Sequence, residues 1–254
     1  MSEIVYIGVD DTDVLGSPGT GKIARGIAEM LFEKGLAKSL GVSRHQLLVD
    51  PRVKYTSHNS CKGIAVITDN FPVVLVKPCS DYIKDHFQPG SDPGLCICSE
   101  KNITPEILAY SVKAETEFIQ KDEAYTLVSG KDIFLTELGG DGGGVIGALA
   151  AVGLRAGGNN GRLVDIRGVR DISGKISVME IKFRTDIVAV SDIDGNELSN
   201  LEIVESLSWI RPNLVNGKPV LKVILSEELT NVEGKRIWIP AEREMKMTKG
   251  DKNE

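Results

Sequence analysis

The sequence is poor in several features that mark particular classes of protein. Of its 254 residues, four are cysteines and 5% are aromatic, and no run of 18 consecutive apolar residues occurs. The missing apolar run and the missing signal peptide argue against a membrane-bound or exported protein. The cysteines lack the paired Cys-x₂₋₄-Cys spacing of zinc ribbons and fit a reducing compartment better than a disulfide framework. We therefore expect a cytoplasmic globular protein.

The overall composition is ordinary for a globular protein. Hydrophobic residues make up 41% and charged residues 26% of the chain, which is long enough for one large domain or two closely associated ones. The formal net charge is −6 and the pI is near 5.3. This acidic balance argues against unaided binding of a polyanion, because phosphate contacts dominate such affinity. It leaves room for a local basic patch.

The most informative stretch is near the start of the chain, where three aspartates follow a short apolar run. Residues 4–9 are typical of a strand, which leads into Asp10, Asp11 and Asp13, and apolar periodicity predicts a helix over residues 23–32. Clustered carboxylates suit Mg²⁺, and a Gly-rich turn that opens a helix offers backbone N–H groups to a phosphate. Because carboxylates and phosphates repel unless a metal lies between them, the stretch predicts a metal–nucleotide site.

The loop after these aspartates contributes Gly19, Thr20, Gly21 and Lys22 to this hypothesis. It is not a Walker A motif, because the spacing differs and Ile23 stands where Ser or Thr is required. A simpler interpretation also stays open. Aspartates at the end of a strand often cap a helix or face water.

A polar and basic segment, residues 52–63, follows a strand predicted over residues 46–50. Its Lys54 and Asn59 are candidates to face a nucleotide or a substrate. His58 in the same segment is more simply explained as a solvated loop residue, because loops are polar and exposed.

A second glycine cluster covers residues 139–144, with five glycines around one aspartate, and leads into a helix rich in Ala, Gly and Leu. Gly142, Gly143 and Gly144 again have the anatomy of an anion site at a helix N-terminus. The alternative is a flexible hinge before a tightly packed core helix. Further along, Arg167 would offset developing charge at a phosphate, or pair with surface acids.

Strands and helices alternate irregularly along the chain, which predicts an α/β or α+β fold of layers with mixed sheets. Helices are expected over residues 104–120 and 198–208, and a strand over residues 177–183. Cys96 and Cys98 are interpreted as small buried residues on one face of a strand rather than as zinc ligands.

Several motifs in the first two-thirds of the chain occur together in one known family. They are Ile-Gly-Val-Asp-Asp-Thr-Asp at residues 7–13, the loop with Thr20, residues 54–59, Asp-Pro-Gly at residues 92–94 and the Gly-Ala helix at residues 143–153. In this combination the chain resembles the archaeal isoleucine-tRNA agmatidine synthetases, which use ATP to activate a wobble cytidine for attack by agmatine.

The resemblance implies roles for the residues of the first stretch. In the family the N-terminal aspartates serve metal binding, ATP binding and catalysis, which assigns these roles to Asp10, Asp11 and Asp13. A threonine in the following loop is a phospho-acceptor in the family, and Thr20 is the matching residue here. The implied cofactors are ATP and Mg²⁺.

The resemblance also implies a kinase-like catalytic domain with an associated ferredoxin-like domain. We expect the ATP- and Mg²⁺-binding kinase-like domain over residues 1–128, the Gly-rich loop and ferredoxin-like α+β domain over residues 129–240, and a frayed polar tail over residues 241–254. The family continues into an OB-fold and a zinc ribbon that grip tRNA, whereas this chain has no paired cysteines. Its loop also carries Gly-Thr-Gly-Lys in place of the family's Met-Cys-Thr-Thr.

The leading hypothesis is a group-transfer enzyme that uses Mg²⁺ and ATP, a phosphotransferase or ligase with a small-molecule or RNA acceptor. ATP phosphates would lie on both glycine loops, with Mg²⁺ between them and the aspartates and with Lys22, Lys54 or Arg167 offsetting charge. Two alternatives stay open: a nucleotide-binding regulatory protein without turnover, and an RNA-modification subunit that acts with a partner protein. Homo-oligomerisation is equally compatible with the sequence.

Overall fold

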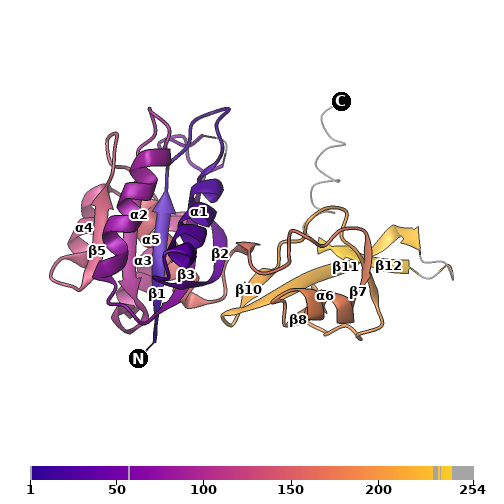
Figure 1. Cartoon of the computed structure of the whole chain (residues 1–254). Helices are drawn as coiled ribbons and strands as arrows, with labels where there is room; N and C mark the ends of the chain where they lie inside the picture. The colour runs from indigo at the N-terminus through magenta and orange to yellow at the C-terminus, as the bar shows by residue number, and fades with distance from the viewer. Residues whose placement is uncertain (1, 57, 231–233, 235, 242–254) are drawn as a thin grey trace. The chain divides into compact units, whose positions relative to one another are not determined.

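The chain folds into two compact units, Met1–Val164 (unit 1) and Asp165–Glu254 (unit 2), shown in Figure 1. The structure is a computed structural model that describes all residues except 1, 57, 231–233, 235 and 242–254. Nearly all of the tail predicted over residues 241–254 therefore lies outside the described residues. No helix in the described part of the chain has both the length and the apolar character needed to cross a bilayer.

Unit 1 is built on a sheet with the strand order β5-β4-β1-β3-β2-β6. These strands are β1 (Glu3–Asp10), β2 (Lys38–Gln46), β3 (Ser60–Thr68), β4 (Gly94–Ser99), β5 (Ile133–Glu137) and β6 (Arg162–Asp165). The central strand β1 runs antiparallel to both of its neighbours, with Val5 opposite Val66 and Ile7 opposite Ile97. The aspartate-bearing end of β1 is thus held between two other strands.

Helices cover both faces of this sheet (Figure 1). They are α1 (Thr20–Glu33), α2 (Val73–His86), α3 (Pro105–Thr116), α4 (Lys121–Val128) and α5 (Gly144–Gly157). α5 packs on β1, β3 and β4, and α3 and α4 pack against α5, whereas α1 packs on β2 and β3 and against α2. Side chains alternate along a strand, so Tyr6 joins the core around α5 while Val5 and Ile7 point to the other face.

The apolar helix α5 approaches β1 so closely that no side chain fits between the two backbones. A Cβ added to Gly8 would lie only 1.8 Å from the carbonyl oxygen of Ala148. This packing makes the Gly-rich segment and its helix part of unit 1. The two units therefore divide after Val164, later in the chain than the position after residue 128 that we expected from the sequence.

Unit 2 is a smaller α+β unit with a mixed sheet. Its elements are β7 (Lys175–Ser177), α6 (Val178–Arg184), β8 (Ala189–Asp192), β9 (Ile203–Glu205), β10 (Asn213–Val215), β11 (Lys218–Thr230) and β12 (Arg236–Pro240). β11 is antiparallel to β10 and β12 but parallel to β8, and β12 is parallel to β9. Its core includes Val169, Ile181 and Leu221. The predicted class, α/β with mixed sheets, is confirmed.

Three local predictions were wrong. The strand expected over residues 46–50 does not form, because β2 spans Lys38–Gln46 and ends where that strand was expected to begin. Residues 178–184 form a helix rather than the predicted strand, because Ser177 accepts a hydrogen bond from the Glu180 N–H and the Glu180 side chain accepts one from the Ser177 N–H. This capping box starts a helix despite the alternating pattern. The helix predicted over residues 198–208 does not form, since Ile203–Glu205 pairs with β7 and β12 as a strand.

Two other predictions were closer to the structure. The helix expected over residues 104–120 begins with proline at its first turn, as predicted, but α3 ends at Thr116 and α4 is a separate helix. Cys96 and Cys98 lie on β4 in the core around α5, as expected. All four cysteines are free and buried.

Candidate functional site

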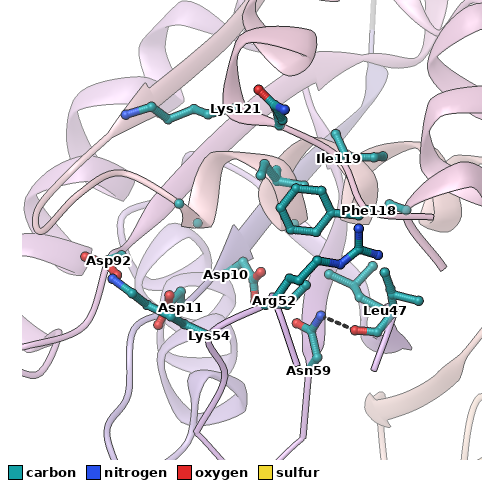
Figure 2. A pocket seen from close by; sticks show the side chains of 18 of the residues that line it. Asp10, Asp11, Leu47, Arg52, Lys54, Asn59, Asp92, Phe118, Ile119 and Lys121 are labelled. Carbon is teal, nitrogen blue, oxygen red and sulfur yellow. Dashed lines mark hydrogen bonds between the residues drawn. The ribbon is translucent and has the colours of Figure 1, made fainter. Parts of the chain in front are cut away.

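A cavity of about 360 Å³ opens in unit 1 where β1 ends and α5 begins. This volume falls within the range of small-molecule sites. The residues that line it come from the end of β1, the segment before β3, the α3–α4 connection and the start of α5: Asp10, Asp11, Leu47, Leu48, Arg52, Val53, Lys54, Asn59, Asp92, Ala114, Glu117, Phe118, Ile119, Gln120, Lys121, Asp141, Gly143, Gly144, Ile146 and Gly147. Figure 2 shows that the cavity has an acidic end and an apolar end.

The acidic end is formed by Asp10, the last residue of β1, and by Asp11, which follows it. Asp10 points toward α5, and a Cβ added to Gly147 would lie 1.8 Å from its Oδ2 atom, so a glycine at position 147 leaves room for the carboxylate. Asp11 has a φ of +52°, a left-handed conformation that is uncommon for residues other than glycine and clusters at functional sites. The fold therefore holds both carboxylates at the cavity wall.

The electrostatics of this end favour a bound cation. Burial raises the pKa of Asp10 to about 7, and Asp11 adds to the rise, although Lys62 opposes it. Burial and the charge of Asp92 raise the pKa of Asp11 to about 6. Burial is the larger cause of both shifts, and repulsion between neighbouring carboxylates adds to it. A divalent cation between them would remove that repulsion.

Carboxylate oxygens are the ligands that Mg²⁺ prefers, and this ion usually keeps several waters and shares itself with substrate phosphates. No group of three His, Cys, Asp or Glu side chains in the described ranges is arranged to hold a metal ion by itself. Asp10 and Asp11 would therefore supply only part of a coordination shell. The donor set fits Mg²⁺ held jointly by the protein and a phosphate chain.

The glycine loop before α5 is held together by two aspartates. Asp92 Oδ1 accepts a hydrogen bond from the Asp141 N–H at 2.6 Å, and its carbonyl accepts one from the Gly144 N–H at 2.9 Å. Asp141 Oδ1 in turn accepts from the Gly143 N–H at 3.1 Å. Two of these N–H groups, those of Asp141 and Gly143, thus bind carboxylates, as is typical of anions at a helix N-terminus. A phosphate at this position has to replace the Asp141 side chain.

Two lysines that line the cavity contact Asp141. Lys54 Nζ lies 2.7 Å from Asp141 Oδ2 in an exposed ion pair, and Lys121 Nζ donates a 2.8 Å hydrogen bond to the Asp141 carbonyl. Exposed pairs of this kind are weak. The Lys54 ammonium is therefore able to turn toward an anion that enters the cavity, whereas Lys121 is also held by an ion pair to Glu137 at 3.2 Å.

The other end of the cavity combines apolar walls with a flat cationic group. The Arg52 guanidinium lies 4.7 Å from the centre of the Phe118 ring and is fixed by two hydrogen bonds to the Asp50 carboxylate, at 2.8 and 2.9 Å. Asn59 donates a 2.6 Å hydrogen bond to the Leu48 carbonyl, drawn as the dashed line in Figure 2. Aromatic side chains and arginine guanidinium groups commonly bind planar rings by stacking on them.

The structure brings together one part of the predicted site. Asp10 and Asp11 share the cavity with Gly143 and Gly144, which are distant in the sequence. The acidic end of β1 and the second glycine loop thus meet in one cavity, as the hypothesis of a shared site requires. Of the other predicted residues, Lys54 and Asn59 also line the cavity.

A second part of the predicted site has other contacts. Thr20 donates a 2.6 Å side-chain hydrogen bond to Asp13 Oδ1, which also accepts the Thr20 N–H at 3.1 Å. Asp13 thereby caps α1, as the simpler interpretation of the aspartates allowed. Neither residue is part of the cavity lining, nor are the predicted residues Gly19, Gly21, Lys22 and Gly142.

Arg167 belongs to unit 2, where its side chain contacts neighbouring residues of that unit. It donates a 2.8 Å hydrogen bond to Asp186 and another to the Thr185 carbonyl at 2.9 Å. This arrangement matches the alternative in which Arg167 pairs with a surface acid.

Among the cavity residues that sequence reasoning from chemistry missed are Arg52, Asp92, Phe118 and Lys121. Asp92 had one signal, its position in the Asp-Pro-Gly motif that resembles the synthetase family. Phe118 and Lys121 fall in what was predicted to be one continuous helix and its end. Because α3 stops at Thr116, the connection to α4 turns these side chains into the cavity.

The fold and the cavity together define an α/β protein with a cavity of small-molecule size whose lining is rich in carboxylates. No protein-family model matches the chain, and no curated protein matches its sequence. Solved structures do match. A complex of TiaS with an isoleucine tRNA and ATP has 27% identity and a TM-score of 0.53 over 65% of this chain and 38% of that one. A tRNA fluorescent labelling enzyme has 28% identity and a TM-score of 0.53, with 64% and 37% covered.

The apo structure of TiaS, an isoleucine-tRNA agmatidine synthetase, has 27% identity and a TM-score of 0.51 over 65% of this chain and 37% of that one. These similarities support a family-level relationship to TiaS, an enzyme that modifies tRNA and binds ATP. The chain spans less than two-fifths of the length of these three structures.

Proposed function

We propose that this protein is a group-transfer enzyme that uses ATP and Mg²⁺, with the triphosphate seated between Asp10, Asp11 and the glycine loop before α5. The observation that carries the proposal is the meeting of two partly buried carboxylates and a helix N-terminus in one cavity of small-molecule size. Carboxylates alone would repel ATP, and a helix N-terminus alone would bind any anion. Their combination suits a metal-bound phosphate chain.

Each group in the cavity has a defined task in this proposal. Asp10 and Asp11 hold Mg²⁺, which when bound neutralises charge between the carboxylates and the phosphates. Lys54 and Lys121 exchange their contacts with Asp141 for contacts with phosphate oxygens, and the vacated N–H groups at the start of α5 receive the same anion. The reaction breaks a phosphoanhydride bond of ATP and joins the phosphoryl or adenylyl group to the acceptor, with ADP or pyrophosphate as the leaving group. Its rate rests on positioning and charge.

RNA is the acceptor class that the comparisons favour, because two similar structures are of a tRNA agmatidine synthetase and one of these contains tRNA and ATP. A small-molecule acceptor is the other possibility. A nucleotide-binding regulator without turnover is the second candidate function, because the cavity would bind a nucleotide equally well without an acceptor.

The proposal is tested by ATP binding and turnover in the Asp11→Asn variant. Asparagine has nearly the same shape but no charge, so it weakens Mg²⁺ coordination without removing volume. We expect ATP turnover to fall by about 100-fold or more, in line with the loss of one charge-stabilising group. Calorimetry with Mg²⁺ and ATP, and phosphate or pyrophosphate release in the presence of total RNA, measure the two effects.

The matched control for this experiment is Asp85→Asn, which removes an exposed carboxylate from α2, away from the residues that line the cavity. Asp85→Asn should bind and turn over ATP like the parent. If Asp11→Asn equals the parent in both assays, the assigned role of the carboxylates is wrong. Tight ATP binding by the parent without release of any product would favour the regulatory alternative.

The apolar end of the cavity gives a separate prediction. We expect Phe118→Ala to weaken ATP binding by roughly 10-fold, because a base that stacks on an aromatic ring gains about 1–3 kcal/mol. Inorganic triphosphate, which has no base, should bind Phe118→Ala and the parent equally. Calorimetric titration with both ligands makes the comparison. Equal loss for ATP and triphosphate would mean that Phe118 does not contact the base.

A further inference from the structure

Lys62 on β3 is a charged side chain in a nearly closed position. Its relative exposure is 7%, and its Nζ atom donates hydrogen bonds to the Ser60 carbonyl at 2.8 Å and to the Ser60 hydroxyl at 3.3 Å. No carboxylate among the described residues comes within ion-pair distance of it. Burial lowers the pKa of Lys62, and the nearby Asp10 carboxylate opposes that shift. A buried ammonium without a direct ion pair is costly to fold. Such a group is retained most readily where an anion completes its environment.

The direction of this side chain separates it from the cavity. Lys62 lies opposite Val9 in the sheet register, so it belongs to the face that α1 covers, whereas Asp10 points to the face covered by α5. Its Cε atom lies 3.6 Å from the position that a Cβ on Gly21 would take. The ammonium therefore sits beneath the first turn of α1, and Lys62 is not among the residues that line the cavity.

Two arginines bring further positive charge to the same place. Arg44 on β2 donates a 3.0 Å hydrogen bond to the Ser60 hydroxyl that Lys62 also contacts. Arg25 of α1 has its Nη1 atom 3.7 Å from the same hypothetical Cβ of Gly21. The first turn of α1 carries no acidic residue, and the positive end of the helix dipole adds to the field. Three cations and a helix N-terminus thus surround Ser60 and Gly21.

We propose that Lys62, Arg44 and Arg25 at the start of α1 form a subsite for a phosphate group, supplied by the RNA backbone of the acceptor. The inference rests on the proposed function, since it locates part of the acceptor of that reaction. The triphosphate already has a place on the other face of the sheet, with its own glycine loop and lysines. Lys62 lies opposite Val9, the residue before Asp10 on β1, so the subsite and the cavity are near neighbours. A nucleotide anchored here by its phosphate can reach the cavity.

The local charge also explains how an acidic chain can bind a polyanion. The net charge of −6 disfavours diffuse attraction, so contact with RNA has to be concentrated where cations gather. Lysine and arginine contacts to backbone phosphates give affinity without sequence readout. The subsite should therefore bind RNA strands of different sequence with similar strength.

The test measures binding of a fluorescein-labelled single-stranded oligoribonucleotide of mixed sequence to the full chain by anisotropy, at several salt concentrations. Lys62→Met keeps the length of the side chain and removes its charge, and replacement of a buried charge by an apolar group of similar volume is often tolerated. We expect oligonucleotide affinity to fall about 10-fold and the log–log salt slope to decrease by about one. Binding of ATP with Mg²⁺ should stay within about threefold of the parent.

Arg44→Met provides a second variant that leaves Lys62 in place, and thermal unfolding checks that both variants are folded. Lys84→Met, an exposed lysine on α2, is the control and should bind the oligonucleotide like the parent. Parental oligonucleotide affinity in both test variants would overturn the proposal, as would a parent that binds no oligonucleotide. Loss of ATP binding with unchanged oligonucleotide binding would assign the subsite to the nucleotide instead.

The two proposals fail in different assays. If Asp11→Asn retains full ATP turnover while Lys62→Met loses RNA affinity, the proposed reaction is wrong but the phosphate subsite stands. If Asp11→Asn loses turnover while Lys62→Met binds RNA normally, the proposed reaction is supported and the proposed phosphate subsite is wrong.

Discussion

Asp10→Asn is expected to make the protein more stable while abolishing its use of ATP. Burial raises the pKa of Asp10 to about 7 in the folded state, whereas an unfolded aspartate titrates near 4. Between these values the folded protein binds a proton more tightly than the unfolded chain, so the free energy of unfolding falls as pH rises from about 4 to 7. Above pH 7 the charged carboxylate lowers the free energy of unfolding by up to about 4 kcal/mol, because each of the roughly three pKa units corresponds to about 1.36 kcal/mol.

Asparagine does not carry this cost, because it has no charge at any pH. The free energy of unfolding of Asp10→Asn should exceed that of the parent by about 2–4 kcal/mol at pH 8, and the gap should close toward pH 4. Urea denaturation at a series of pH values without divalent cations measures it. Addition of Mg²⁺ and ATP should stabilise the parent and leave Asp10→Asn unchanged, because only the parent binds the metal-bound nucleotide.

Asp85→Asn again serves as the control and should alter the free energy of unfolding by less than about 0.5 kcal/mol, as is usual at exposed positions. A variant Asp10→Asn that is less stable than the parent at pH 8 would show that the carboxylate is paired rather than strained. A trade of stability for activity at this residue would be typical of a functional site.

Gly8→Ala should be among the most damaging single substitutions in the chain. A Cβ at this position would lie 1.8 Å from the backbone oxygen of Ala148 and 3.2 Å from a methyl group of Val152. Because the nearer atom belongs to the backbone of α5, no side-chain rotation relieves the clash. The helix has to move off the sheet, and we expect a loss of about 4 kcal/mol or more in the free energy of unfolding.

Gly157→Ala is the matched control, since it adds the same methyl group to a glycine near the end of α5. There the new Cβ would meet only a methyl group of Leu108 at 3.8 Å, an ordinary contact, and alanine favours helix by about 0.5–1 kcal/mol. Chemical denaturation of the two variants should therefore change the midpoint in opposite directions. Similar stability of Gly8→Ala and the parent would mean that α5 does not pack on β1 in this way.

The movement of α5 should also reach the site, because the same helix carries Gly143, Gly144 and Gly147 to the cavity. Residual folded Gly8→Ala is therefore expected to bind ATP more weakly than the parent. The control Gly157→Ala should bind ATP normally. This links the packing of one strand glycine to the geometry of the site.

Local sequence signals predicted the elements of the site but only part of their arrangement. An apolar run before clustered aspartates predicted the end of β1, and a proline and an acid in the first turn predicted α3. By contrast, the capping box at Ser177 was overlooked in favour of alternation, so α6 was predicted as a strand. Residues with competing short-range signals are decided by the contacts they make after folding.

The sequence by itself determined that carboxylates end a strand and that two glycine-rich turns open helices, because these features depend on neighbours within a few residues. Only the tertiary structure decided which helix start faces the carboxylates. Asp13 turns back to cap α1, whereas the missing side chain of Gly8 lets α5 approach β1 and places its first turn beside Asp10. That choice depends on backbone contact between Gly8 and Ala148, far apart in the chain, and no local pattern in the sequence records it.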